Sequence, residues 1–297
     1  MQPNPLLKRL GFAAGDRVVI IHTDDIGMCQ ASVDAFAGLY EACIISSGAV
    51  MVPCPWFLAA AQFARQHPQV DLGVHLTLTS EWQTYRWGPV SPRSSSSSLL
   101  DAEGYFPHRS SEIQEKGDPA SVEVELEAQI KRALQFGMQP THIDTHMGAV
   151  AHIKFMASYV QLAWKYHLPP MIFRLDETGY RALGMDPAAA TFACRMIQEQ
   201  ESNRLPLLDH MAAMPLDTPQ DRMDRTKQAF AALEPGLTHF IIHPSVDTPE
   251  LRAITPDWAC RAADYQDFLN TDLLATLSHL GIHVIGYRAL QDVMPKI

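Results

Sequence analysis

Short runs of apolar residues recur along the chain and are separated by longer segments of mixed polarity. Seven of these runs are apolar without a clear alternation and rich in β-branched residues: 17–22, 48–52, 72–79, 141–145, 171–175, 238–243 and 283–287. Continuous apolarity over so few residues is typical of strands that are buried on both faces of a parallel sheet. We therefore predict a strand at each of the seven positions.

Several of the intervening segments carry the signals with which helices begin and end. Residues 121–136 have apolar positions at helical spacing, follow Asp118-Pro119 and stop at Gly137, as expected for a helix with a proline start and a glycine cap. Two further helices are expected to begin at Asp186-Pro187 and Thr218-Pro219, and a last one to span about 271–280 before Gly281.

Strands that alternate with helices imply βαβ units with right-handed crossovers. About seven such units fit a single α/β domain, a (β/α) barrel of parallel strands over residues 1–297, better than a chain cut into two domains. A long irregular loop interrupts the pattern at about 80–117, and its serine tract at 94–98 is expected to be exposed. A loop of this length in a compact domain is usually a functional lid or a disordered insert.

Composition narrows the classes of partner. The 297 residues include 23 Lys and Arg against 33 Asp and Glu, so the formal net charge is -10, which argues against binding to nucleic acid or to an anionic membrane surface. The five scattered cysteines form no C-x-x-C pair, which indicates neither a thiolate zinc site nor a disulfide framework. The chain shows no secretory signal and no apolar run near the roughly 18 residues of a membrane span, so a cytoplasmic protein is expected; a homo-oligomer stays open.

Two adjacent carboxylates, Asp24 and Asp25, directly follow the first predicted strand. Such a pair is costly to bury unless it is paired, hydrogen-bonded or bound to a metal, although an aspartate at this place is also a common helix N-cap. His75 lies within the otherwise apolar third run, where a hydrogen-bonded core histidine is the usual explanation. Taken alone, neither signal is specific.

More polar residues fall at the ends of two other runs. The alternation of the fourth run places His142, Asp144 and His146 on one strand face, and His243 ends the sixth run. In α/β folds the strand ends on one side gather into the active-site mouth. One aspartate and two histidines from separate strands form a typical incomplete ligand set, and a neighbouring carboxylate could accept a proton from water. The pattern therefore predicts a mononuclear metal hydrolase.

The segments 23–27, 73–76, 141–146 and 243–245 resemble the YdjC-like carbohydrate deacetylases in order and rough spacing, and the likeness extends from about residue 17 to the C-terminus. The motifs depart from the family's usual ones in three places: Ile26 stands for the phenylalanine of D-D-F-G, Thr145 for the serine of D-S-H, and Ser245 for the glycine of H-P-G. The further histidines that usually follow D-S-H are missing. These departures bear on the substrate more than on the metal.

The resemblance implies a barrel related to the metal-dependent polysaccharide deacetylases, with a small-molecule N-acetylated sugar as substrate and hydrolysis of its acetamide as the reaction. By matching positions it implies that Asp25, His75 and His146 hold one divalent metal, that Asp24 is the general base, that His243 is the acid or stabilises the tetrahedral intermediate, and that His142 and Asp144 lie next to these groups. Zinc suits this ligand set best, while magnesium, manganese, cobalt and nickel also fit histidine and carboxylate ligands.

Two features outside the motifs are candidates for substrate binding. Trp82, Tyr85 and Trp87 open the long loop, where aromatic faces suit stacking on sugar rings, though they would equally serve to anchor the loop. Arg174 ends the fifth run and could bind a sugar oxygen or orient Asp24; a plain salt bridge is the alternative.

Two other functions remain open from the residues. An amidohydrolase or phosphoesterase barrel commonly shows a His-x-His at its first strand, whereas this strand ends in His22-Thr23-Asp24-Asp25, and a two-metal phosphoesterase would bind two ions. A non-catalytic sugar-binding protein on the same fold would be expected to have lost the base or a ligand, and both are kept. Among acetylated substrates the choice stays open, because specificity would lie in the long loop.

Overall fold

Seven parallel strands form one curled sheet in the computed structural model, which describes residues 2–296. The strands are β1 (Arg17–Ile26), β2 (Ser47–Val50), β3 (Leu72–Leu76), β4 (Ile143–Thr145), β5 (His210–Ala213), β6 (Gly236–Ile242) and β7 (Ile282–Val284). Their order across the sheet is β4-β3-β2-β1-β6-β5, and β7 pairs with the beginning of β1. The α/β class and the parallel pairing agree with the prediction.

Strand β1 is the centre of the sheet and shows why its sequence is apolar throughout. Val18 and Ile20 pack in one buried cluster with Leu237, whereas Val19 and Ile21 pack in another. Successive side chains of a strand point to opposite faces, and here both faces are covered. An uninterrupted apolar run is therefore the expected pattern.

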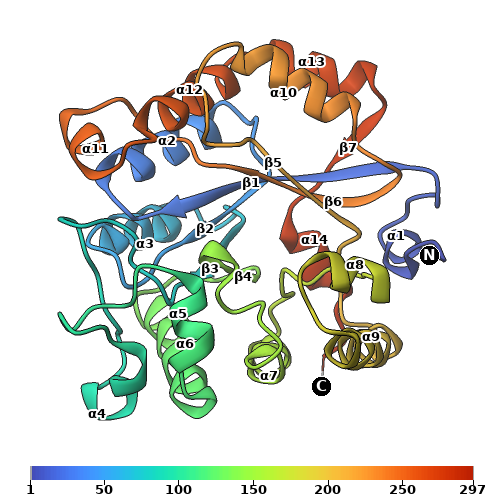
Figure 1. Ribbon diagram of the computed structural model, residues 1–297. Coiled ribbons are helices and arrows are strands. Elements are labelled where there is room, and N and C mark those ends of the chain that lie inside the picture. The colour runs from blue at the N-terminus through green and yellow to red at the C-terminus, as the bar shows by residue number, and fades with distance from the viewer. Residues whose placement is uncertain (1, 297) are drawn as a thin grey trace.

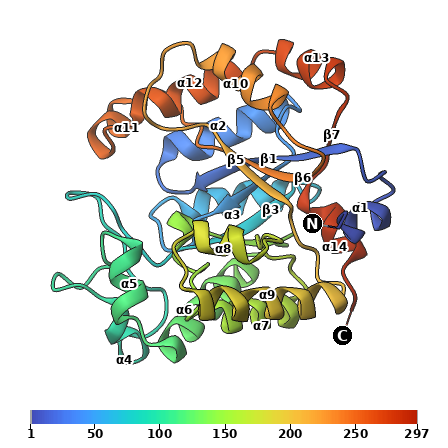
Figure 2. The same ribbon diagram turned by 45° about the vertical axis from the view of Figure 1, so that its right-hand side comes forward.

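Helices surround the outside of the sheet (Figure 1). They are α1 (Pro5–Arg9), α2 (Gln30–Glu41), α3 (Phe57–Gln66), α4 (Arg93–Ser96), α5 (Ser110–Lys116), α6 (Pro119–Gln135), α7 (Met156–Tyr166), α8 (Glu177–Ala182), α9 (Pro187–Ser202), α10 (Arg222–Ala231), α11 (Pro249–Ile254), α12 (Trp258–Phe268), α13 (Asp272–His279) and α14 (Tyr287–Val293). The turned view places α6, α7 and α9 together below the sheet and α4 and α5 to one side (Figure 2). Within the described residues, none of these helices combines the length and the apolarity needed to cross a membrane.

The predicted helix starts are confirmed in two of three cases. The side chain of Asp118 accepts the backbone N–H of Ser121 at the start of α6, and Asp186 caps α9 in the same way. The predicted last helix corresponds to α13, which is followed by Gly281 with φ of 65°. The third start is wrong, because α10 begins only at Arg222, after a turn that follows Thr218-Pro219.

The predicted closed barrel is not confirmed, because the sheet stays open between β4 and β5. Residues 171–175, predicted as the fifth strand, lie in this gap but form only isolated bridges, which join Ile143 to Pro170 and Phe173 to Leu208. Pro169 and Pro170 lack the N–H groups that a regular ladder needs. The missing donors explain why an apolar, β-branched segment does not become a strand here.

Strand β5 was not predicted, because its residues alternate between half-buried and exposed, and Met211 is 60% exposed. The long loop carries α4, a 3-10 turn and α5. Of its serine tract, Ser94 and Ser97 are exposed as expected, whereas Ser96 is fully buried. Within the loop, the buried guanidinium of Arg86 pairs with Asp101 at 2.6 Å and donates to the carbonyl of Phe106 at 2.7 Å. The loop is thus held by internal ion pairs.

Candidate metal and catalytic centre

The backbone of β1 turns between two adjacent aspartates. Asp25 has φ of 62°, in the left-handed region, and the register of β1 with β2 shifts between Thr23 and Ile26. A non-glycine residue in such a conformation costs of order 1–3 kcal/mol and persists only where its surroundings hold it. Regular alternation would send neighbouring side chains to opposite faces. Because of the turn, Asp24 and Asp25 both reach the same histidine, His75, with oxygens 3.8 and 3.5 Å from its Nε2.

Three ligand-type atoms converge at this point. Asp25 Oδ1 lies 3.5 Å from His75 Nε2 and 3.1 Å from His146 Nδ1, and the two ring nitrogens are 3.2 Å apart. All three residues are buried, and they come from β1, β3 and the turn that follows β4. The structure therefore brings the three predicted metal ligands together.

The far side of each histidine ring faces a carboxylate. His75 and Asp144 are register partners on β3 and β4, and His75 Nδ1 lies 2.8 Å from Asp144 Oδ1. His146 Nε2 lies 3.1 Å from Glu81 Oε2. Asp144 is hydrogen-bonded to His75 and so fixes the N–H of that ring on Nδ1, whereas Glu81 forms an ion pair with His146 without a hydrogen bond to its Nε2. His75 Nε2 and His146 Nδ1 face the point of convergence and hold hydrogen there, which a bound metal ion would displace.

The remaining oxygen of Asp25 is held by a buried arginine. Arg261 Nη1 donates to Asp25 Oδ2 at 2.7 Å, and Arg261 Nε donates to Asp257 at 2.7 Å. Burial acts to raise the pKa of Asp25, but Arg261 and His146 together lower it well below its usual value. The carboxylate therefore keeps Oδ1 directed at the two histidines, and this oxygen accepts no hydrogen bond from the described residues.

The charges around the site attract cations. Burial would lower the pKa of His75, yet Asp144 and Asp24 raise it well above its usual value. Burial would also lower the pKa of His146, but Glu81 and Asp25 raise it to about 9. One carboxylate oxygen and two imidazole nitrogens suit zinc and related divalent ions, and such an ion would displace the protons that these rings attract. The residues present fit a divalent metal.

Asp24 and His243 border the same point. Asp24 Oδ1 lies 2.7 Å from His22 Nδ1, while its Oδ2 lies 3.8 Å from His75 Nε2 and 3.9 Å from His243 Nε2. Burial acts to raise the pKa of Asp24, but His75 and His22 lower it overall. His243 follows β6, its backbone N–H donates to Asp264 Oδ2 at 3.1 Å, and burial lowers the pKa of its ring. The two predicted catalytic residues therefore face one another across the site.

The three aromatic residues of the loop gather near this centre but differ in exposure. Trp87 is buried, its ring centre lies 6.4 Å from that of His146, and its Nε1–H donates to the carbonyl of Thr79 at 2.7 Å. Trp82 and Tyr85 are half-buried. Trp87 has the contacts of a loop anchor, whereas Trp82 and Tyr85 keep some surface that a ligand could contact.

Arg174 does not join the cluster. Its guanidinium donates to Asp209 Oδ1 at 2.9 Å and pairs with Glu201. Asp209 immediately precedes β5 and accepts the backbone N–H of Leu237 near the start of β6. It therefore lies at the end of the sheet where the strands begin, whereas the convergent ligands lie where the strands end. The contacts of Arg174 are those of the salt-bridge alternative.

A second buried group lies behind the first. Ligand-type atoms of His22, Asp24, Asp144 and His239 all lie within 4.8 Å of one another, as do those of Asp25, His75 and His146. His22 Nε2 lies 2.9 Å from His142 Nε2, and His239 Nδ1 lies 2.9 Å from the hydroxyl of Tyr287. The two rings of this second group are thus hydrogen-bonded to residues outside it, His22 to His142 and His239 to Tyr287.

Four residues of the site were not predicted from the sequence: His22, Glu81, His239 and Arg261. His22 could have been found, because it stands two residues before Asp24 on a strand and so shares its face. Arg261 begins a closing segment that resembles the family's ending, but nothing in the sequence indicated that it reaches Asp25 across 236 positions.

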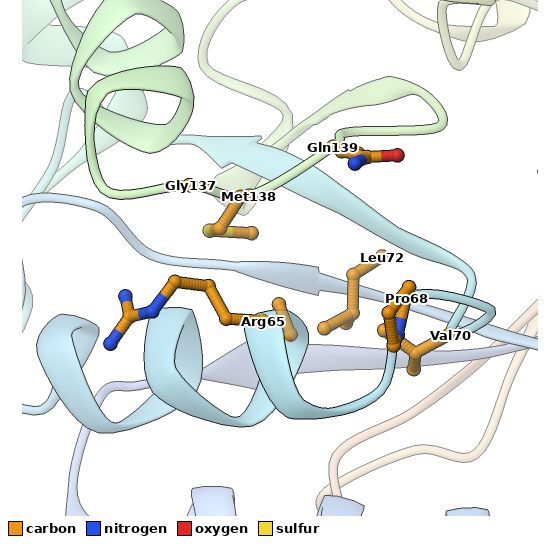
Figure 3. A pocket seen from close by; sticks show the side chains of 8 residues that line it. Arg65, Pro68, Val70, Leu72, Gly137, Met138 and Gln139 are labelled. Atoms are coloured by element: carbon orange, nitrogen blue, oxygen red, sulfur yellow. The ribbon is translucent and has the colours of Figure 1, made fainter.

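A separate cavity of about 280 Å³ lies away from these residues. It is bounded by the end of α3, the beginning of β3 and the segment after α6, and its lining includes Arg65, Leu72 and Met138 (Figure 3). It contains none of the candidate catalytic or metal-binding side chains.

Comparisons with known proteins agree on one family. A family model described as YdjC-like protein matches residues 18–279. A carbohydrate deacetylase from Thermus thermophilus is 34% identical over 97% of this chain and 99% of the relative, and one from Thermoanaerobacter pseudethanolicus is 24% identical over 93% of this chain and 100% of the relative. A crystal structure of a proposed cellobiose-phosphate cleavage protein from Enterococcus faecalis shares the fold, with a TM-score of 0.72, 22% identity, and coverage of 93% of this chain and 99% of that chain.

Proposed function

Because the chain belongs to the YdjC-like family, we propose that it is a carbohydrate deacetylase that removes the acetyl group from an N-acetylated sugar or oligosaccharide. The observation that carries this proposal is the convergence of Asp25 Oδ1, His75 Nε2 and His146 Nδ1 beside the carboxylate of Asp24. Curated relatives with the name carbohydrate deacetylase support the reaction type over almost the whole chain.

In this proposal Asp25, His75 and His146 hold one divalent ion, with zinc as the first candidate and magnesium, manganese, cobalt and nickel as alternatives. When bound, such an ion supplies Lewis acidity toward the acetyl carbonyl and toward water. The protein holds its own ligands in place, because Asp144 and Glu81 fix the two rings and Arg261 fixes the carboxylate.

Asp24 acts as the general base through Oδ2. Its Oδ1 is already engaged by His22 Nδ1, whereas Oδ2 faces His75 and His243 at 3.8 and 3.9 Å and is free to accept a proton from the attacking water. A positioned general base contributes a factor of roughly 10²–10⁴ to a rate. The two oxygens of Asp24 therefore have different roles in this proposal, one structural and one chemical.

His243 acts on the other side of the reacting carbon. Because burial lowers the pKa of its ring, the neutral imidazole is its resting form. As a neutral N–H donor it can stabilise the oxygen of the tetrahedral intermediate. To act as the acid for the departing amine it must first gain a proton, and Asp24, 3.9 Å away, is the nearest carboxylate that could supply one.

The sugar would contact the half-buried aromatic residues at the start of the loop. Trp82 and Tyr85 both keep exposed surface near the centre, and the faces of aromatic rings suit the apolar faces of sugar rings. We therefore assign substrate contact to Trp82 and Tyr85 and an anchoring role to Trp87.

The experiment that tests the proposal measures acetate release from a panel of N-acetylated sugars and chitin oligosaccharides. The full-length protein is assayed as purified, after chelation, and after metal is added back. Release that is lost on chelation and restored by one divalent metal supports the proposal. Chelator-sensitive cleavage of phosphate esters with no acetate release would instead favour a phosphoesterase, and sugar binding without any turnover would favour a non-catalytic protein.

A further inference from the structure

A continuous hydrogen-bonded chain of side chains runs through the protein interior from Asp24 to Asp71. Asp24 Oδ1 lies 2.7 Å from His22 Nδ1, and His22 Nε2 lies 2.9 Å from His142 Nε2. His142 Nδ1 lies 3.0 Å from the hydroxyl of Thr141, which lies 2.5 Å from Asp71 Oδ1. His22, His142 and Thr141 are fully buried, so water does not compete for these contacts.

The surrounding residues fix the orientation of the rings in this chain. His22 shares one face of β1 with Asp24 because the two are two residues apart. The ring of His142 stacks on that of Tyr287 with centres 3.8 Å apart and planes 12° from parallel. Gly73 leaves the room that this ring needs, since a Cβ at that position would come within 2.5 Å of it. The stacking and the close approach of Gly73 therefore hold the ring of His142 in its orientation.

The number of hydrogens in the chain follows from the number of contacts. Four hydrogen bonds join Asp24, His22, His142, Thr141 and Asp71, and each needs one hydrogen. Two neutral imidazoles and one hydroxyl provide only three, because carboxylates are acceptors alone and a neutral imidazole carries a single N–H. The chain must therefore hold one further proton.

The end at Asp71 sets the direction of the hydrogen bonds. Asp71 Oδ2 accepts the backbone N–H of Arg288 at 2.7 Å, and Asp71 Oδ1 accepts the hydroxyl of Ser47 at 3.0 Å. Burial raises the pKa of the Asp71 carboxyl above its usual value, and the donors Thr141, Arg288 and Ser47 only lessen that rise. Because Asp71 already accepts from the hydroxyl of Ser47 and the N–H of Arg288, we infer that it accepts from Thr141 as well, and Thr141 then accepts from His142 Nδ1.

That direction leaves the additional proton on His22. If His142 donates through Nδ1, its Nε2 is bare and must accept from His22 Nε2–H, while His22 Nδ1–H donates to Asp24. Burial and the neighbouring His22 both lower the pKa of His142, which favours this neutral state. His22 Nε2 also lies 3.6 Å from Asp144 Oδ2, an oxygen that accepts no hydrogen bond from the described residues.

The groups that face the His22 ring are two carboxylates, two histidines and a tyrosine: Asp24, Asp144, His142, His239 and Tyr287. Burial lowers the pKa of His239 as it does that of His142. Among the groups that face the His22 ring, only the two carboxylates therefore carry a charge.

We propose that this chain stores one proton and holds it on His22, whose charged Nδ1–H positions Asp24 by fixing Oδ1 and leaving Oδ2 toward the candidate site. His22 is then a positioning residue, because it contacts Asp24 and does not itself touch the reacting atoms. The stored proton stands on the geometry alone, whereas its use in catalysis rests on the proposed role of Asp24.

The direct test is nuclear magnetic resonance of the full-length, metal-free protein labelled with ¹⁵N-histidine, at about pH 7.5. Long-range ¹H–¹⁵N correlation separates a ring with two protonated nitrogens from a neutral ring with one bare nitrogen. The raised pKa values of His75 and His146 make those two rings doubly protonated as well in the metal-free protein. We therefore expect one further doubly protonated ring, assigned to His22 because its signals vanish in His22→Asn. A bare nitrogen on His22 in the wild-type protein overturns the proposal.

A substitution at the far end of the chain gives a sharper test. In Asp71→Asn the side-chain amide can donate to Thr141, which reverses the three hydrogen bonds between residue 71 and His22, leaves His22 Nδ1–H donating to Asp24, and allows both rings to be neutral. We expect His22 to lose its second proton in this variant although the two residues do not touch. Ser47→Ala is the matched control, because it removes another contact of Asp71 without supplying a donor, and His22 should stay doubly protonated. Persistence of the doubly protonated ring in Asp71→Asn would contradict the stored proton.

The positioning role is tested by two substitutions of His22. His22→Asn keeps an N–H near the Nδ1 position, and His22→Leu removes it. Loss of a charged hydrogen bond should lower kcat by about tenfold or more in the leucine variant, with partial recovery in the asparagine variant and with the zinc affinity of the metal-free protein within about twofold of wild type. An equal loss of zinc affinity would make His22 a merely structural residue. If the wild-type protein releases no acetate while the resonance result holds, the proposed function fails and the stored proton stands.

Discussion

Glu81 Oε2 lies 3.1 Å from Nε2 of His146, on the side of the ring opposite to the nitrogen that faces Asp25. This contact joins the long loop after β3 to the candidate metal centre. Asp144 makes the equivalent contact with His75 from the neighbouring strand. A carboxylate behind a ligating histidine orients the ring and raises its basicity, so the loop contributes to the site before any substrate binds.

The first prediction concerns this carboxylate. Glu81→Gln keeps the shape of the side chain but removes its charge, so the ring of His146 becomes a weaker ligand. We expect the zinc affinity of the metal-free protein to fall by about 10–100-fold, as measured by competition with a chromogenic chelator. Glu103→Gln is the control, because Glu103 belongs to the same loop and its side chain is 69% exposed. Equal affinities in the two variants would show that Glu81 does not support the metal.

The second prediction separates the base from the ligands. Asp24→Asn keeps the volume of the side chain and removes the acceptor that takes the proton from water. We expect turnover to fall by roughly 10²–10⁴ while one zinc ion per chain is retained, as measured by acetate release and metal analysis of the same sample. Near-native turnover would exclude Asp24 as the base.

The third prediction distinguishes the two tryptophans of the loop. Trp87 is 3% exposed and hydrogen-bonded, so Trp87→Ala should lower the free energy of unfolding by about 3–5 kcal/mol. Trp82 is half-buried, and Trp82→Ala should instead raise KM for the sugar with little change in stability. Denaturant unfolding and steady-state kinetics of both variants check this, and a KM unchanged in Trp82→Ala would remove it from the substrate site.

The fourth prediction concerns pH and stability away from the site. Hydrogen bonds from Lys165 and Tyr166 lower the pKa of Glu127 from 4.5 to about 2. A carboxyl whose pKa is depressed by folding stabilises the native state above its unfolded pKa, and this stabilisation is lost as the pH falls through the folded pKa. Above about pH 4.5 the wild-type protein should have a larger free energy of unfolding than Glu127→Gln. This difference should shrink as the pH falls from about 4.5 to 2, as measured by urea unfolding at each pH. A difference that stays constant over this range would contradict the assigned shift.

The sequence predicted the α/β class and six of the strands, most clearly β1, whose residues are buried on both faces. It did not predict the gap between β4 and β5, because the apolar segment 171–175 resembles a strand and only Pro169 and Pro170 indicate otherwise. Strand β5 was missed for the opposite reason, since its exposed Met211 gives it no continuous apolar character.

The candidate site was predictable where strand ends carry unusual polar residues, as at Asp24, His75 and His146. The turn at Asp25 was not predictable, since its positive φ is imposed by surrounding contacts and not by a glycine. Partners from distant segments were equally hidden: Arg261 reaches Asp25 across 236 positions. For the same reason Arg174 looked like a site residue in the sequence, although its ion-pair partners Asp209 and Glu201 lie elsewhere in the fold.

The most direct test of the central claim is the position of the zinc ion in crystals of the zinc-loaded protein, located by anomalous scattering at the zinc edge. We predict one strong peak bonded to Asp25 Oδ1, His75 Nε2 and His146 Nδ1 at about 2.0–2.2 Å. A peak among His22, Asp24, Asp144 and His239, or no peak in the protein interior, would contradict the account.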